Sequence, residues 1–430
     1  KNDIFFAIKG NKIDGNKFVS EALKKKSSLS IVNKFDQNYS LSKQIKVKNS
    51  LSFLTKCSSI FRRNINAKII SITGSCGKTT LKEMIGFTLK KISKTSFSPK
   101  SFNNKYGVPL SLFNLKQDDK FGVFELGMNK KGEINDLSKI VNPDLGIITN
   151  ISYAHSKNFR NINQIADAKA EIMNNIRENG TIVLNRDDRF YNYHKNYALK
   201  KKLKIITFGI KNKSATTKLV RIKKRNNKFE LLINMDDIYV SFYSANKNTS
   251  NLYNILATLA SISLYVDIKS LKKDIFLNFK IPGGRGDISK IKLDNRNFFL
   301  VDETYNSNPL SLKTAIENFD KLPIKNSHKY LILGDMLELG RHSIKQHKLI
   351  SKVINKTNVN KVYVIGKYIK ETFKNLNRNK QAKILTNKKA VIDEINNKLS
   401  NNDYLMIKGS NSTGLHNITT KLKQRVSNAI

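Results

Sequence analysis

The sequence is poor in the residues that build covalent or metal-bound frameworks. Its 430 residues include two cysteines, Cys57 and Cys76, six prolines and no tryptophan. Two cysteines cannot form a disulfide framework or a metal site made of cysteines alone, so we expect a reducing compartment, the cytosol. No stretch contains the ~18 uncharged apolar residues that a membrane-spanning helix requires, and the apolar segment 4–8 is too short for a signal-peptide core. Because the chain begins at Lys1 without a methionine, we expect a few residues to precede it.

Acidic residues are scarce relative to basic ones. The chain has 78 Lys and Arg against 33 Asp and Glu, which gives a net charge of +45. Such an excess is typical of proteins that bind nucleic acids, anionic membrane surfaces or polyanionic substrates. The basic residues nevertheless recur in every segment instead of forming one tail or stripe. We therefore interpret the charge as a compositional bias and expect no specific nucleic-acid partner and a monomeric protein.

The chain is too long for one ordinary domain, and its hydrophobic pattern divides it into three parts. Residues 1–66 predict a small α/β unit, with strands at 4–8 and 30–32 and a helix at 18–23. Residues 67–284 alternate apolar strands with helices and end in an antiparallel hairpin at 219–243. The expected strands are 69–72, 122–125, 145–149 and 181–184, and the expected helices are 79–92 and 162–176.

The third part, residues 285–430, repeats the order strand then helix. Its expected strands are 298–301, 330–333, 362–365 and 404–407, and its expected helices are 310–319, 344–354 and 391–399. Apolar strands that alternate with helices predict parallel sheets covered on both faces, so the fold class is α/β. Such sheets bind ligands beyond the carboxyl ends of their strands.

The first chemical signal is a glycine-containing loop between a predicted strand and a predicted helix. It reads Gly74-Ser75-Cys76-Gly77-Lys78-Thr79-Thr80. Backbone N–H groups at a helix N-terminus bind phosphates, a lysine here neutralises β and γ phosphates, and the Thr79 hydroxyl can bind Mg²⁺. Ile72 stands where G-x-x-x-x-G-K-S/T has its first glycine, so the loop resembles that of ATP-dependent ligases more than that of Ras-like GTPases. The alternative, a glycine-rich turn with an incidental lysine, is disfavoured by the strand–loop–helix setting.

Three further polar residues follow predicted strands or lie on the next helix. Glu125 ends an apolar strand, where a carboxylate beside a phosphate loop can hold Mg²⁺ directly or through water. His155 follows the next strand, and Lys169 lies 14 residues later. Each also has an ordinary interpretation: a solvated carboxylate, a hydrogen-bonded histidine and an exposed helix lysine.

Several segments, in the same order along the chain, resemble the Mur ligase family. They are residues 5–15, 74–80, 102–110, 125–134, 150–155, 302–309 and 333–340. The resemblance implies a UDP-substrate domain at 1–66, an ATP-binding domain at 67–284, and a Rossmann-like domain at 285–430 that closes on ATP and the dipeptide. It also implies an amide ligase that activates a carboxylate as an acyl phosphate. The last two segments are similar to the branch that joins D-Ala-D-Ala to UDP-MurNAc-tripeptide in cytoplasmic peptidoglycan precursor synthesis.

The resemblance also implies roles for individual residues. Lys169 would be carbamylated and would bind Mg²⁺ with Thr79, Glu125 and His155. A free ammonium would repel the metal, whereas a carbamate is an anionic ligand. The implied catalytic set consists of Lys78, Glu125, His155 and Lys169. The implied ATP contacts are the loop 74–80 with Asn251, Asn254, Arg285 and Asp302, and the implied substrate contacts are Asn103, Asn104, Tyr305, Asn306 and Asn308.

The sequence departs from the family pattern at a few positions. Ser250 takes the place of a histidine before Asn251, Lys100 takes the place of a glycine, and Asn411 takes the place of an arginine found in many relatives. Two alternatives stay open: a related amide ligase of the folylpolyglutamate type, and a nucleic-acid-dependent P-loop NTPase. The third residue of the tripeptide, diaminopimelate or lysine, also stays open.

Overall fold

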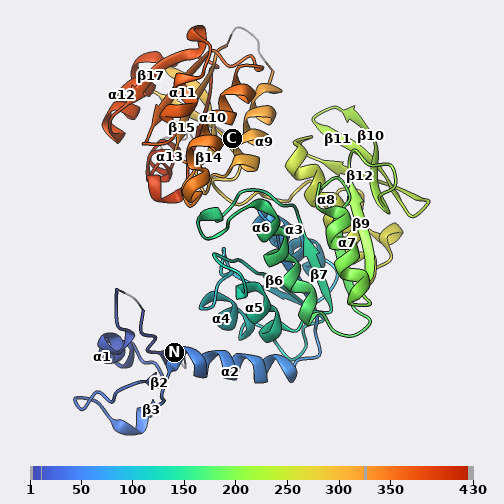
Figure 1. Cartoon of the computed structure of the whole chain (residues 1–430), viewed down its shortest axis with the longest axis vertical. Helices are drawn as coiled ribbons and strands as arrows, with labels where there is room; N and C mark the ends of the chain where they lie inside the picture. The colour runs from blue at the N-terminus through green and yellow to red at the C-terminus, as the bar shows by residue number, and fades with distance from the viewer. Residues whose placement is uncertain (1–2, 11, 324–326, 425–430) are drawn as a thin grey trace.

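The computed structural model describes residues 3–10, 12–323 and 327–424 and contains three separate β-sheets. Each sheet lies within one of the three predicted parts, and the exact limits of those parts stay a prediction. The N-terminal unit lies at one end of the molecule, the central unit in the middle and the C-terminal unit at the other end (Figure 1). Within the described residues, no helix combines the length and the apolar character needed to cross a membrane.

The N-terminal unit has a three-stranded parallel sheet in the order β1-β2-β3. Its elements are β1 (Ile4–Phe6), α1 (Val19–Lys24), β2 (Leu29–Val32), β3 (Gln44–Lys46) and α2 (Ser50–Arg63). The helix α2 leads to the central unit, and the hydrophobic pattern did not predict it. Its buried face consists of Ser50, Leu54, Ser58 and Arg62, so a helical spacing is present but only one of the four residues is apolar.

The central unit is built on a nine-stranded sheet in the order β12-β11-β10-β9-β8-β7-β4-β6-β5. Its strands are β4 (Lys68–Thr73), β5 (Thr95–Phe97), β6 (Phe121–Glu125), β7 (Leu145–Ile148), β8 (Thr181–Asn185), β9 (Lys204–Gly209), β10 (Thr217–Arg225), β11 (Lys228–Met235) and β12 (Ile238–Ser244). Its helices are α3 (Lys78–Lys90), α4 (Gly107–Leu112), α5 (Glu133–Val141), α6 (Ile162–Ala170), α7 (Tyr191–Lys200) and α8 (Thr249–Ile262).

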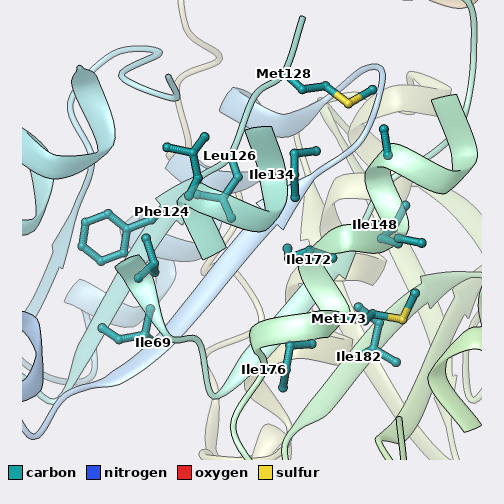
Figure 2. Packing of buried hydrophobic residues seen from close by; sticks show 14 of the residues in the cluster. Ile69, Phe124, Leu126, Met128, Ile134, Ile148, Ile172, Met173, Ile176 and Ile182 are labelled. Carbon is teal, nitrogen blue, oxygen red and sulfur yellow. The ribbon is translucent and has the colours of Figure 1, made fainter. Parts of the chain in front are cut away.

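Alternate residues of the central strands face opposite sides of the sheet, and both sides are buried. Ile69 and Phe124 belong to the core shared with α5 and α6 (Figure 2). Ile70 and Val123 belong to the core shared with α3 and α8. This arrangement confirms the predicted parallel sheet covered on both faces.

Two details of the central unit differ from the sequence-based expectation. The predicted hairpin is a three-stranded antiparallel meander, β10-β11-β12, because a second turn occurs at Asp236 and Asp237, both with positive φ. The predicted helix 162–176 ends at Ala170 and continues as a 3-10 helix, Glu171–Asn175.

The C-terminal unit has a six-stranded sheet in the order β13-β14-β18-β15-β16-β17, which is parallel except for β13. Its strands are β13 (Asp287–Leu293), β14 (Arg296–Glu303), β15 (Lys329–Gly334), β16 (Lys361–Ile365), β17 (Gln381–Leu385) and β18 (Tyr404–Lys408). Its helices are α9 (Pro309–Asp320), α10 (Ser343–Ile354), α11 (Lys370–Lys374), α12 (Lys388–Lys398) and α13 (His416–Lys423). The α/β fold class predicted for this part is confirmed.

Candidate active site

The phosphate loop joins the end of β4 to the start of α3 and is held in a fixed shape. The Cys76 N–H donates to Asn150 Oδ1 at 2.9 Å, and the Thr149 hydroxyl donates to the Cys76 carbonyl at 2.6 Å. Gly74 has φ +141°, and a Cβ atom at this position would lie 1.9 Å from Thr149 Oγ1. A glycine is therefore required here, and the backbone N–H groups at the start of α3 are preorganised for an anion.

A cavity of about 610 Å³ lies at this loop, between the central and C-terminal units. Its volume is within the range of small-molecule sites. Most of the residues predicted from the sequence contribute to its wall. They are Ser75, Cys76, Gly77, Lys78, Thr79, Thr80, Asn103, Glu125, His155, Asn251, Asn254, Arg285, Tyr305, Asn306 and Asn308. Gly74, Asn104, Lys169 and Asp302 are not part of the wall.

Thr79 and Glu125 form the pair predicted to hold Mg²⁺. Glu125 ends β6 and is 1% exposed; its Oε2 accepts from the Thr79 hydroxyl at 2.6 Å. Its Oε1 accepts from Asn103 Nδ2, also at 2.6 Å. The described residues contain no group of three or more His, Cys, Asp or Glu side chains that could hold a metal. A hydroxyl beside one carboxylate still suits Mg²⁺, which commonly binds through one or two carboxylates together with water and phosphate oxygens.

His155 lies in the wall of the same cavity but contacts the C-terminal unit. Its backbone has φ +53°, and its Nδ1 lies 2.6 Å from Oε2 of Glu338. The two atoms lack the alignment of a hydrogen bond, so the contact is a close approach of a ring nitrogen to a carboxylate oxygen. The contact lowers the pKa of Glu338. Metal binding by His155 stays a prediction.

Lys169 lies on α6 and is 2% exposed, so its ordinary interpretation as an exposed helix lysine is wrong. Burial lowers the pKa of Lys169 well below its usual value, and the nearby charge of Lys78 lowers it further. No hydrogen bond or ion pair links its amine to another residue in the described part of the chain. The neutral amine is the form that can react with CO₂, so this environment is compatible with the predicted carbamate.

Arg285 reaches the phosphate loop from the C-terminal side. Its Nη2 donates to Thr79 Oγ1 at 2.9 Å, and its guanidinium lies 3.8 Å above the ring centre of Tyr305. Its Nε is buried and has no hydrogen-bond partner among the described residues. A buried, unpaired guanidinium N–H at the edge of a phosphate loop suits an anionic ligand.

Four residues that were predicted to contact a ligand make hydrogen bonds to other residues of the protein. The Asp302 carboxylate accepts from Thr304 Oγ1 at 2.6 Å and from Lys423 at 2.5 Å. Asn104 Oδ1 accepts from the Tyr106 and Gly107 N–H groups at the start of α4. Asn308 caps α9, and Asn251 donates to Ser244 Oγ. The predicted ligand contacts of these four residues stay predictions.

Sequence reasoning missed several polar residues that line the cavity. Ser101 Oγ lies within hydrogen-bond distance of Thr79, Tyr305 and Arg285. The Lys408 ammonium binds Glu303 Oε2 at 3.0 Å and the Asn306 carbonyl at 3.0 Å. The only sequence signal for Ser101 was its place just before the Asn103-Asn104 segment, because a single serine carries no pattern of its own.

Comparison with known proteins gives consistent matches along the chain. The family model for the Mur ligase middle domain matches residues 72–262, and that for the Mur ligase, glutamate ligase domain matches residues 290–411. A UDP-N-acetylmuramoyl-tripeptide–D-alanyl-D-alanine ligase from Buchnera aphidicola is 32% identical over 425 residues, which cover 97% of this chain and 90% of that relative.

Solved structures resemble the whole chain. The crystal structure of MurF from Acinetobacter baumannii has a TM-score of 0.86 at 25% identity and covers 98% of this chain and 90% of its own. The MurF ligase from Thermotoga maritima in complex with ADP has a TM-score of 0.83 and covers 99% of this chain and 95% of its own. The latter is 23% identical and therefore shows a similar fold.

Proposed function

Because this chain belongs to the Mur ligase family, we propose that it joins D-Ala-D-Ala to UDP-MurNAc-tripeptide with the use of ATP. The reaction would take place in the synthesis of peptidoglycan precursors. The observation that carries the proposal is the convergence of Lys78, Thr79 and Arg285 on one cavity. The relative from Buchnera aphidicola, which carries this ligase name, matches nearly the full chain and so supports the choice of substrates.

The chemical problem is that a carboxylate is a poor acyl donor. ATP with Mg²⁺ would supply the phosphoryl group that turns the peptide carboxylate into an acyl phosphate. Phosphoryl transfer requires positioning and charge neutralisation more than a nucleophilic side chain. Lys78, the N-terminus of α3 and Arg285 would hold the phosphate oxygens, and the unpaired Nε of Arg285 leaves a donor free for that purpose.

We propose that Thr79, Glu125, His155 and carbamylated Lys169 would hold the metal. The support differs among the four residues. Thr79 and Glu125 already touch each other at 2.6 Å, whereas His155 contacts Glu338, and Lys169 is buried near the charge of Lys78. A carbamate on Lys169 would add an anionic oxygen ligand at a position where burial disfavours the ammonium form.

The remaining predicted contacts concern the two peptide substrates and the adenine of ATP. We propose that Asn103, Tyr305 and Asn306, which line the cavity, bind the peptide or the dipeptide. Asn251 and Asn254 on α8 would contact adenine. The C-terminal unit would exclude water from the acyl phosphate, because it forms one side of the cavity opposite the phosphate loop.

The direct test is a coupled assay of ADP release with mass spectrometry of the product. UDP-MurNAc-tripeptide together with D-Ala-D-Ala should stimulate ADP release and yield one pentapeptide product. Testing tripeptides with lysine or diaminopimelate also identifies the third residue. Stimulation by folate substrates with glutamate, or by DNA or RNA, would instead support the two rival functions.

The matched variants are Lys78→Ala and Lys345→Ala. Lys78 points into the loop and donates to the Gly74 carbonyl at 2.9 Å, whereas Lys345 is an exposed residue on α10. We expect the first change to reduce ADP release by at least about 100-fold, the usual effect of removing one such electrostatic contact, and the second to leave it unchanged. Near-normal turnover of the Lys78 variant would refute the phosphate-loop assignment.

A further inference from the structure

The Ser101 hydroxyl lies where the phosphate loop meets the C-terminal unit. We propose that Ser101 is a positioning residue that couples closure of the C-terminal unit to the orientation of the Thr79 hydroxyl. The inference rests on the proposed function, because Thr79 is assigned there to the metal and phosphate site.

The hydrogen bonds around Ser101 can run in only one direction, because each hydroxyl group has a single proton to donate. A hydroxyl has one proton to donate and two lone pairs to accept, while a carboxylate only accepts. Thr79 donates to Glu125 at 2.6 Å, so it must accept from Ser101 at 3.0 Å. Ser101 has then used its proton and accepts from the Tyr305 hydroxyl at 2.6 Å.

The result is a one-way chain of donors from Tyr305 through Ser101 and Thr79 to Glu125. The first member belongs to the C-terminal unit and the other three to the central unit. Arg285 reinforces the junction, because its Nη2 lies 2.9 Å from Thr79 Oγ1 and 3.3 Å from Ser101 Oγ. Removal of Tyr305 takes away the donor that holds the Ser101 oxygen in place, so the bond from Ser101 to Thr79, and with it the orientation of Thr79, depends on the position of the C-terminal unit.

The turn that carries Ser101 is fixed by a buried lysine. Lys82, on the helix that begins at the phosphate loop, is fully buried, and its ammonium donates to the Ser98 carbonyl and, at 2.7 Å, to the Lys100 carbonyl. Lys100 has φ +47°, a left-handed conformation that side-chain-bearing residues seldom adopt. The charge-assisted bonds from Lys82 stabilise this unfavourable turn and so fix Ser101 relative to α3.

The same turn offers a matched control. Ser98 is also buried, and its hydroxyl has no hydrogen-bond partner in the described part of the structure. Ser98→Ala therefore removes a hydroxyl from the same turn without touching the chain of donors. Ser101→Ala removes the link, and Ser101→Thr keeps it.

The experiment compares these variants, Tyr305→Phe and the double variant Ser101→Ala/Tyr305→Phe. We expect Ser101→Ala to lower kcat about tenfold, the usual effect of losing the one bond that orients Thr79, while Ser98→Ala changes nothing and Ser101→Thr restores most of the rate. The double variant should be no slower than the slower single variant, because both changes break the same link. Additive effects, or an equal loss in Ser98→Ala, would overturn the proposal and leave Ser101 a merely structural residue.

A second readout does not depend on ligase activity. Binding of ADP with Mg²⁺ is measured by calorimetry, and compaction on binding by small-angle X-ray scattering. Ser101→Ala should bind ADP more weakly and compact less than the wild type and Ser98→Ala; wild-type values for both quantities would refute the inference. If the wild type binds ADP but joins no peptide, the proposed function fails, and the binding and scattering results still decide the role of Ser101.

Discussion

Replacing His194 by glutamine should remove a pH-dependent part of the stability of the central unit. His194 lies on α7, is 2% exposed, and its Nε2 is 3.2 Å from the Ala166 carbonyl of α6. Because a carbonyl only accepts, Nε2 carries the proton of the neutral ring. Burial lowers the pKa of His194 from 6.5 to about 4, although the bond to Ala166 acts in the opposite direction.

The size of this change in the free energy of unfolding follows from the difference between the pKa values of His194 in the folded and unfolded chain. At pH values between 6.5 and about 4, the unfolded chain holds a proton that folded His194 does not. The free energy of unfolding therefore falls as the pH is lowered through this window, and the contribution of the neutral ring is fully present above it. A shift of two to three pKa units at 1.36 kcal/mol each gives a loss of about 3 kcal/mol.

The assay is urea unfolding of the wild type and His194→Gln at a series of pH values from 7.5 to about 4. Hydrogen exchange of the peptide that covers α7 identifies the relevant transition, since a chain with several domains need not unfold in one step. Glutamine preserves a donor to Ala166 but does not titrate. The difference in the free energy of unfolding between the wild type and the variant at pH 7.5 therefore measures packing alone. On acidification, the free energy of unfolding of the wild type should fall by about 3 kcal/mol more than that of the variant. Parallel stability curves would refute the reasoning.

Two further predictions concern buried basic residues. Lys169 should take up one labelled carbon from ¹³C-bicarbonate as a carbamate, detectable by NMR, and dialysis against CO₂-free buffer should lower activity reversibly, because an amine without the carbamate offers the metal no anionic oxygen ligand. Full activity without bicarbonate and no carbamate signal would contradict this assignment. Arg62→Met should destabilise the protein by about 3 kcal/mol in urea unfolding, since three carbonyls, two of them in buried hydrogen bonds, would lose their donor. These carbonyls belong to Ile65, Val141 and Asn142, and a loss below about 1 kcal/mol would show that water or a rearrangement replaces the guanidinium.

Four strands of the central sheet, β4, β6, β7 and β8, could be predicted closely because each is a short and mainly apolar run. The segment 69–72 lies within β4, and 122–125 lies within β6. Both faces of these strands are buried, so nearly every residue is apolar and the run is visible in the sequence. The helix α2 escaped prediction for the opposite reason, because its buried side is mainly polar and includes Arg62.

The candidate site could be predicted in part. The phosphate loop and Glu125 were found because a loop after a strand and a carboxylate at a strand end have a recognisable place in an α/β fold. The burial of Lys169 could not be predicted, because a lysine on a helix is exposed in most proteins. The tertiary structure buries it, since α6 belongs to the core on one side of the central sheet and Lys169 is 2% exposed.

The sequence by itself determined the alternation of strands and helices in the central and C-terminal parts, the phosphate loop and the chemistry available at its tip. These features depend on periodicity and on short motifs, which are local along the chain. The tertiary structure alone decided that Tyr305 meets Ser101, 204 positions earlier, and that Arg285 meets Thr79. Such contacts depend on how two sheets are placed relative to each other, and no local pattern of residues encodes that placement.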